Sequence, residues 1–279
     1  MTDPVLFALI AGVFGLLIGS FLNVCIYRWT RDLSVVRPRS ACPSCNHLIA
    51  WYDNVPVLSY LLLRGRCRYC REMIAWTYPA VELLTALFFG YFAALDGPSP
   101  LAAKDCLFAA ILIGLIFSDL DTRLLPDQFT LGGLCAGMAL SFFVPLPPTL
   151  FGLLAGMAGF EPDPRYVSFG EAMLGAFVPA GVMWLLGLVT GKVLNKEALG
   201  FGDVKMVAMM GAFLGIGKVL LALMLGSVLG LLVALPMRIA RRNRGSEYLP
   251  FASYLGTAGL VVVANIFGIV SGLEAFLGW

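Results

Sequence analysis

Long apolar runs, separated by short polar segments, dominate the chain from end to end. Eight candidate membrane spans are predicted, at about 5–27, 78–95, 101–118, 128–146, 168–191, 204–216, 218–237 and 249–270. A bilayer core of about 30 Å needs roughly 20 apolar residues in a helix, and continuous runs exclude the alternating pattern of a membrane barrel. The pattern therefore predicts an all-α polytopic membrane protein with about eight transmembrane helices. The sixth run is short and rich in Gly and Met, which is typical of helices that break near a functional site.

Composition agrees with this class, because 59% of the 279 residues are hydrophobic and only 13% are charged. Soluble domains carry about a quarter charged residues. The segment before the first run has no basic residue, and Arg28 and Arg31 follow that run. We therefore expect a retained first span and not a cleaved signal peptide.

The basic residues predict the orientation of the chain in the membrane. With the N-terminus outside, sixteen of them lie in cytoplasmic segments: Arg28, Arg31, Arg37, Arg39, Arg64, Arg66, Arg68, Arg71, Arg123, Lys192, Lys196, Lys205, Arg238, Arg241, Arg242 and Arg244. Only Lys104, Arg165 and Lys218 remain outside. This asymmetry predicts a periplasmic N-terminus. The predicted domains are a first helix (1–27), a cytoplasmic module (28–77) and a membrane domain (78–279), with 147–167 as a plain external connector and no internal repeat.

Two CxxC pairs mark the 28–77 module as a metal site. Cys42, Cys45, Cys67 and Cys70 form a C-x2-C-x21-C-x2-C pattern, in which each pair aims two thiolates at one point of a tetrahedral zinc site. Cytoplasmic placement disfavours disulfides, although redox chemistry stays open as an alternative. Four thiolates leave no position for water, so the predicted zinc is structural. The other three cysteines, Cys25, Cys106 and Cys135, are interpreted as small buried hydrophobic side chains.

The chain has one histidine, which limits the chemistry available to it. His47 lies two residues after Cys45, where a surface position is favoured over a fifth metal ligand. A Ser-His-Asp triad or a histidine metal site would have to use this residue, and no HExxH, Walker A or Rossmann glycine motif is present. Any catalysis must therefore use carboxylates.

Two aspartate clusters flank predicted spans at the cytoplasmic face. Asp119 ends the third run, and Asp203 closes a Gly200-Phe201-Gly202-Asp203 tetrad before the sixth. Two carboxylates that share a site, one ionised and one protonated, are the machinery of aspartic proteases. The two glycines, Gly200 and Gly202, leave room for a substrate backbone. The helix dipole favours Asp203 as the anion and Asp119 as the proton holder.

Neighbouring polar residues are candidates for substrate recognition or for support of the loops. Asp121 is either a solvated loop acid or a contact for a basic substrate, and Asp127, after Pro126, is either a helix N-cap or such a contact. Lys205, two residues after Asp203, is a further supporting candidate.

These motifs together resemble the type IV prepilin peptidases, a branch of the GxGD membrane aspartic proteases. The resemblance includes Gly19-Ser20-Phe21-Leu22-Asn23-Val24, both CxxC pairs, the run from Trp51 to Tyr60, Tyr78-Pro79-Ala80-Val81-Glu82, and both aspartate motifs. It implies cleavage of basic leaders from prepilins and pseudopilins by Asp119 and Asp203 at the cytoplasmic side of the bacterial inner membrane.

The resemblance also implies N-methylation of the new N-terminus with S-adenosylmethionine as the donor. We place the methyl-transfer site where the cysteine module meets the membrane, with Glu82 as the candidate that binds the ammonium or the donor; a plain helix-start acid is the alternative. Membrane lipid is an expected partner and nucleic acid is not. An ion-coupled transporter with intramembrane aspartates, or an inactive scaffold, is the rival interpretation.

Overall fold

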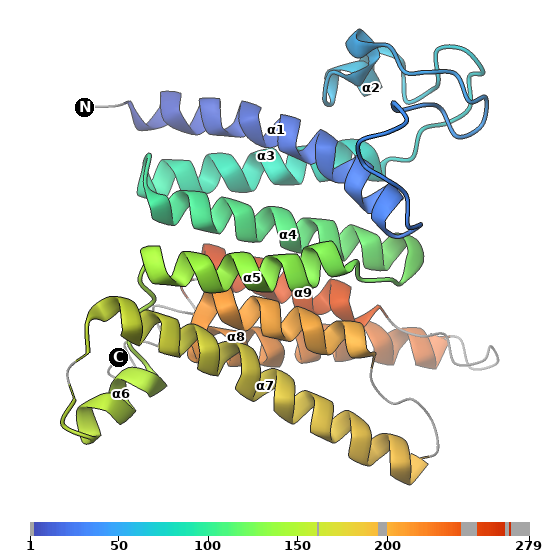
Figure 1. Cartoon of the computed structure of the whole chain (residues 1–279). Coiled ribbons are helices and arrows are strands. Elements are labelled where there is room, and N and C mark those ends of the chain that lie inside the picture. Colours follow the sequence, from blue (N-terminus) through green and yellow to red (C-terminus); the bar gives the residue numbers. More distant parts are fainter. Residues whose placement is uncertain (1–2, 161, 195–199, 241–249, 266–267, 269–279) are drawn as a thin grey trace. The chain divides into compact units, whose positions relative to one another are not determined.

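The computed structural model describes residues 3–160, 162–194, 200–240, 250–265 and 268, and the described part of the chain is helical (Figure 1). It divides into two compact units, Met1–Thr122 and Arg123–Trp279. The first unit contains α1 (Pro4–Trp29), the 3-10 turn η1 (Trp51–Asn54), α2 (Leu58–Leu62), α3 (Thr77–Asp96) and α4 (Pro100–Thr122). The second contains α5 (Asp127–Phe143), α6 (Leu150–Met157), α7 (Pro164–Leu194), α8 (Phe201–Ala240) and α9 (Phe251–Ala264).

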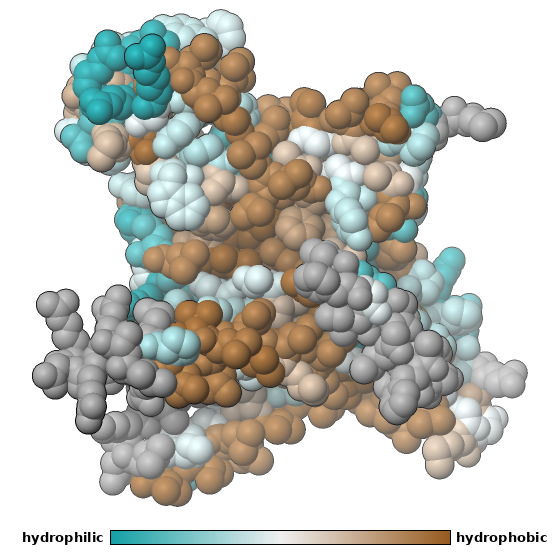
Figure 2. Space-filling view, turned by 180° about the vertical axis from the view of Figure 1, so that it is seen from behind, coloured by the Kyte–Doolittle hydropathy of each residue, from teal (hydrophilic) through white to brown (hydrophobic). Residues whose placement is uncertain are grey.

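In the first unit, α1 packs closely along α3. A Cβ atom on Gly19 would lie 2.6 Å from the Cα atom of Glu82, so only glycine allows this approach. The opposite face of α1 is apolar and exposed, from Val5 through Phe21. Figure 2 shows apolar side chains over the helices of this unit and hydrophilic ones on the loop module. An exposed apolar helix face of this length belongs against lipid.

In the second unit, α8 changes direction at Gly215. Its φ of 75° and ψ of 176° are non-helical, and the positive φ is one that glycine adopts at little cost. An unbroken helix of 40 residues would be about 60 Å long, twice the bilayer core. The kink divides it into two segments, 201–214 and 216–240, at the boundary that the sequence predicts between two spans.

The prediction of eight spans is confirmed in part. Among the described residues, five helices are long and apolar enough to cross a membrane: α1, α3, α4, α7 and α8. The sixth and seventh predicted spans both lie inside α8. The fourth predicted span corresponds to α5, which has 17 residues. The last corresponds to α9 for its described part. Residues 249, 266–267 and 269–270 of that span lie outside the described residues, as do Lys196, Arg241, Arg242 and Arg244.

The expectation of a plain connector at 147–167 is wrong, because α6 forms there. Glu171 on α7 is fully buried and accepts hydrogen bonds from the backbone N–H groups of Thr149 (2.5 Å) and Gly152 (3.1 Å). It also accepts one from the Thr149 hydroxyl at 2.5 Å. This carboxylate therefore satisfies the first N–H groups of α6 in place of a local cap.

Candidate metal centre and aspartate sites

The four cysteines of the CxxC pairs converge on one point. The Sγ atoms of Cys42, Cys45, Cys67 and Cys70 all lie within 4.8 Å of one another, and those of Cys42 and Cys70 are 3.8 Å apart. A tetrahedral zinc with Zn–S bonds of about 2.3 Å requires sulfur atoms about 3.8 Å apart. The predicted ligand set is therefore brought together with the spacing that such an ion needs.

Each CxxC pair sits in a turn of the same construction. In the first turn, Cys42 N–H donates to His47 O (2.9 Å) and Asn46 N–H donates to Cys42 O (2.8 Å). In the second, Cys67 N–H donates to Glu72 O (2.8 Å) and Arg71 N–H to Cys67 O (3.1 Å). The matching residues are 25 positions apart, and the flanking bridges, Ala41 with Leu48 and Arg66 with Met73, keep this offset. The module thus contains a short internal repeat, contrary to our expectation of none.

Backbone geometry tunes the second turn for metal binding. The N–H groups of Cys70 and Tyr69 point at the Cys67 sulfur and lower the pKa of that thiol to about 7. A thiolate is the form of cysteine that binds metal, so these two N–H groups favour the ligating state of Cys67.

Two side-chain contacts support the turns besides any metal, one between the two turns and one between the second turn and η1. The rings of His47 and Tyr69 lie 3.5 Å apart between centroids. His47 is therefore occupied in packing, as the surface interpretation predicts, and it is not among the clustered ligands. Arg68 donates two hydrogen bonds, of 2.5 and 2.7 Å, to Asp53 in η1, and this pairing holds the pKa of the Asp53 carboxyl below its usual value. Sequence reasoning missed this pair.

Glu82 connects the module to the helices of the first unit. It is buried on α3, and its carboxylate accepts the Val57 N–H at 2.7 Å, directly before α2. Val57 has φ 59° and ψ −47°, an unfavourable backbone conformation for a β-branched residue. Asn23 of α1 donates to Tyr78 O nearby, at 3.0 Å. Glu82 therefore has a partner within its own unit, which the helix-start interpretation did not foresee.

The first aspartate cluster lies in the last turns of α4. Ser118 and Asp119 are buried, whereas Asp121 is exposed. Asp121 belongs to the helix and not to a loop, and its carboxylate lies 3.1 Å from the Arg31 guanidinium. The cluster therefore contains two carboxylates that are two residues apart: Asp119, which is buried, and Asp121, which is exposed and paired with Arg31.

The second cluster opens α8. Asp203 is half-buried in the first turn of the helix, and its N–H donates to Gly200 O at 3.1 Å. A Cβ atom on Gly200 would lie 3.4 Å from Asp203 Oδ2, and one on Gly202 would lie 3.2 Å from Leu125 Cδ1. The absence of a side chain at Gly200 thus keeps space clear beside the carboxylate, and its absence at Gly202 lets the start of α8 pack against Leu125.

Lys205 and Asp127 form an ion pair between the first turns of α8 and α5. Asp127 is the first residue of α5, after an N-cap at Pro126 that makes no side-chain cap. The N-cap interpretation of Asp127 is therefore wrong, because its carboxylate is used by Lys205. Asp119 belongs to the first unit and Asp203 to the second, and their pairing stays a prediction from the sequence.

Comparison with known proteins matches both units to one group of enzymes. Residues 13–95 match the profile described as "Bacterial Peptidase A24 N-terminal domain", and residues 106–235 match "Type IV leader peptidase family". No solved structure matches the chain.

Several curated proteins are similar over most of the chain. A "Prepilin leader peptidase/N-methyltransferase" from Aeromonas hydrophila is 35% identical over 284 residues, covering 93% of this chain and 91% of the relative. A protein of the same name from Myxococcus xanthus is 44% identical over 211 residues, covering 75% of this chain but 56% of the relative's length. A "Type 4 prepilin-like proteins leader peptide-processing enzyme" from Escherichia coli is 33% identical, covering 93% of this chain and 94% of the relative.

Proposed function

Because the chain belongs to the type IV leader peptidase family, we propose that it is a bifunctional prepilin peptidase and N-methyltransferase. It cleaves the basic leader from prepilins, and from pseudopilins of type II secretion, and then methylates the new N-terminus. The observation that supports the peptidase activity is the presence of a carboxylate at each of two helix ends. Asp119 at the end of α4 is buried, and Asp203 at the start of α8 is half-buried. Both lie inside the segment 106–235 that matches the family profile.

The two carboxylates divide the work of an aspartic protease. Asp203 lies in the first turn of α8, where the helix dipole stabilises an anion, so it accepts the proton of the attacking water. Asp119 lies at the end of α4, where the dipole disfavours an anion, so it carries the proton that is donated to the scissile carbonyl. Because Gly200 and Gly202 have no side chains, an extended substrate backbone can approach Asp203 closely.

The peptidase is tested by co-expression of the chain with a prepilin and mass spectrometry of the product. Wild-type protein is expected to yield the processed pilin with one added methyl group. Asp119→Asn and Asp203→Asn should each abolish cleavage, and Asp96→Asn, an exposed aspartate at the end of α3, should not. Cleavage that persists in either active-site variant would refute the assignment, and solute uptake without cleavage would support a transporter instead.

Leader recognition uses the exposed acids beside the two carboxylates. Asp121 and Asp127 are paired with Arg31 and Lys205 in the free protein. A basic leader would replace these partners, since exposed ion pairs contribute only about 0–1 kcal/mol. In the double variant with both acids changed to Asn, the preference for basic over neutral leaders should fall. An unchanged preference would refute this role.

Methyl transfer belongs to the cysteine module, whose four thiolates would hold a structural zinc. The spacing of the Sγ atoms supports zinc, and the donor implied by the family resemblance is S-adenosylmethionine. Because Glu82 ties the module to α1 and α3 through Val57, its support of methyl transfer acts through the position of the module.

The chain lies in the bacterial inner membrane with its N-terminus in the periplasm. The sixteen-to-three distribution of basic residues supports this orientation. Both aspartates and the cysteine module then face the cytoplasm. Accessibility labelling of Ser34→Cys, at an exposed module position that is not a metal ligand, tests this: a membrane-impermeant thiol reagent should label it only after the spheroplasts are lysed.

A further inference from the structure

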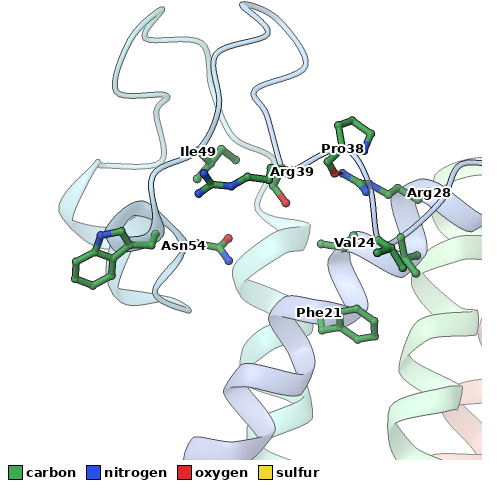
Figure 3. A pocket seen from close by; sticks show the side chains of 11 residues that line it. Phe21, Val24, Arg28, Pro38, Arg39, Ile49 and Asn54 are labelled. Carbon is green, nitrogen blue, oxygen red and sulfur yellow. Dashed lines mark hydrogen bonds between the residues drawn. The ribbon is translucent and has the colours of Figure 1, made fainter.

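A cavity of about 320 Å³ lies between the C-terminal half of α1 and the loop module, wholly within the first unit. Side chains from both elements face it in Figure 3, including Phe21 and Val24 of α1 and Arg39, Ile49 and Asn54 of the module. Its volume is at the lower end of the range for small-molecule sites, about 300–1,000 Å³.

The floor of the cavity is apolar and continues onto the face of α1 that we assign to lipid. Phe21 lines the cavity and is also 51% exposed, next to Leu17 at 55%. Only 17% of the most apolar window of α1 is buried. Phe21 therefore connects the cavity to the lipid-facing side of α1, from which a molecule in the bilayer would enter.

The other wall of the cavity is cationic, with Arg28 from the end of α1 and Arg39 from the module. Arg28 is buried and donates to Ser34 O (2.7 Å) and Pro38 O (2.6 Å), which fixes its guanidinium at the rim. Arg39 is exposed, and within the described residues it makes no side-chain hydrogen bond or ion pair. The lining contains no Asp or Glu to offset the two charges. The site is therefore suited to an anion.

These two walls discriminate between possible ligands. S-adenosylmethionine carries a sulfonium cation, which two arginines without a neighbouring carboxylate disfavour. A free phosphate would leave the apolar floor unused. A phospholipid has a phosphate for the arginines and acyl chains for the apolar floor. A phospholipid with a net negative charge also avoids placing a headgroup ammonium beside the arginines. Basic pockets at the cytoplasmic surface of membrane proteins bind anionic headgroups in this way.

We propose that this cavity binds an anionic phospholipid, with its phosphate at Arg39 and Asn54 and an acyl chain along Phe21 and Val24. The bound lipid fills the space between α1 and the module and so couples the module to the membrane surface. This inference does not depend on the proposed enzymatic activities.

Native mass spectrometry of the full chain, released from nanodiscs of mixed phosphatidylglycerol and phosphatidylcholine, tests the proposal. Wild-type protein should retain phosphatidylglycerol selectively. Arg39→Gln should weaken this retention about fivefold, from roughly 1 kcal/mol per basic residue near the surface. Arg66→Gln removes the same charge from an exposed position of the module outside the cavity, and it should leave retention unchanged.

Two further measurements separate the alternatives. Val24→Phe places a larger side chain in the apolar part of the cavity and should reduce lipid retention. This variant tests the site independently if Arg39→Gln disturbs the module, and zinc content reports whether the module is intact. Glycerol 3-phosphate, the headgroup without chains, should not compete. Equal effects of Arg39→Gln and Arg66→Gln, no loss in Val24→Phe, competition by glycerol 3-phosphate, or displacement by S-adenosylmethionine would each overturn the proposal.

Discussion

Substitution of Gly211 tests whether the close contact between α7 and α8 holds the catalytic helix in place. A Cβ atom at this position would lie 1.9 Å from Gly175 O and 2.2 Å from Gly175 C, both backbone atoms of α7. A carbon and a carbonyl oxygen approach no closer than about 3.3 Å without strain. Gly211→Ala must therefore separate the two helices by about 1.5 Å.

The magnitude follows from comparison with a glycine in open space. Gly181 of α7 has no atom within 4 Å of its would-be Cβ, so Gly181→Ala gains helix propensity of up to about 1 kcal/mol. Gly211→Ala gains the same propensity but adds an overpacking cost of about 1–3 kcal/mol. We expect the free energy of unfolding of the Gly211 variant to be lower than that of the Gly181 variant by about this cost.

The assay measures unfolding of both variants in the same detergent, followed by cleavage of a prepilin peptide. Gly211 and Asp203 lie on the same segment of α8, before the kink at Gly215. Separation of α8 from α7 should therefore also slow cleavage, whereas Gly181→Ala should cleave normally. Equal stabilities of the two variants would show that the contact is easily relaxed and would refute the reasoning.

The other predictions concern the module and α6. Removal of zinc by a chelator, or Cys67→Ser, should abolish methyl transfer and leave cleavage intact, since the aspartates lie outside the module. Metal content measures the loss of zinc, and the mass of a co-expressed pilin measures methylation and cleavage. Parallel loss of cleavage would contradict this prediction. Glu82→Gln leaves an acceptor for the Val57 N–H and should retain most methyl transfer, whereas Glu82→Ala removes it and should reduce methyl transfer severalfold, with zinc content unchanged in both. If the two variants lose activity equally, the charge and not the hydrogen bond to Val57 is what matters. Glu171→Ala leaves the first N–H groups of α6 unsatisfied and should lower the stability by about 1–3 kcal/mol. Proteolysis near Thr149 should therefore be faster in Glu171→Ala than in Glu171→Gln. Equal rates would refute the capping role.

The sequence predicted most helices because an apolar run of bilayer length has few other structures available to it. It failed at α6, where the run 150–157 is too short to span a membrane. The N–H groups of that helix are satisfied by Glu171, about 20 positions later. The structural role of such a distant acid is not visible in local patterns.

The cysteine ligands were predictable because zinc imposes the spacing of each CxxC pair. The repeat between the turns was also visible in residue identity, because the pattern C-x2-C-x3-Ile-Ala-Trp occurs twice, at 42–51 and at 67–76. Sequence reasoning missed it. The partners of Asp121 and Asp127 lie 90 and 78 positions away. Sequence reasoning placed these acids near helix ends, with Asp121 as a loop acid and Asp127 as an N-cap among its interpretations, and it could not identify the cations beside them.

The acid that caps α6 has a consequence for how the chain is made. Leu150 leaves the ribosome 21 residues before Glu171, and at about 5–20 residues per second this interval is roughly 1–4 s. During that time the first amide groups of α6 lack the Glu171 carboxylate that accepts their hydrogen bonds in the folded chain. The final structure of α6 therefore forms only after the start of α7 has been synthesised, which makes the order of synthesis part of the assembly of this segment.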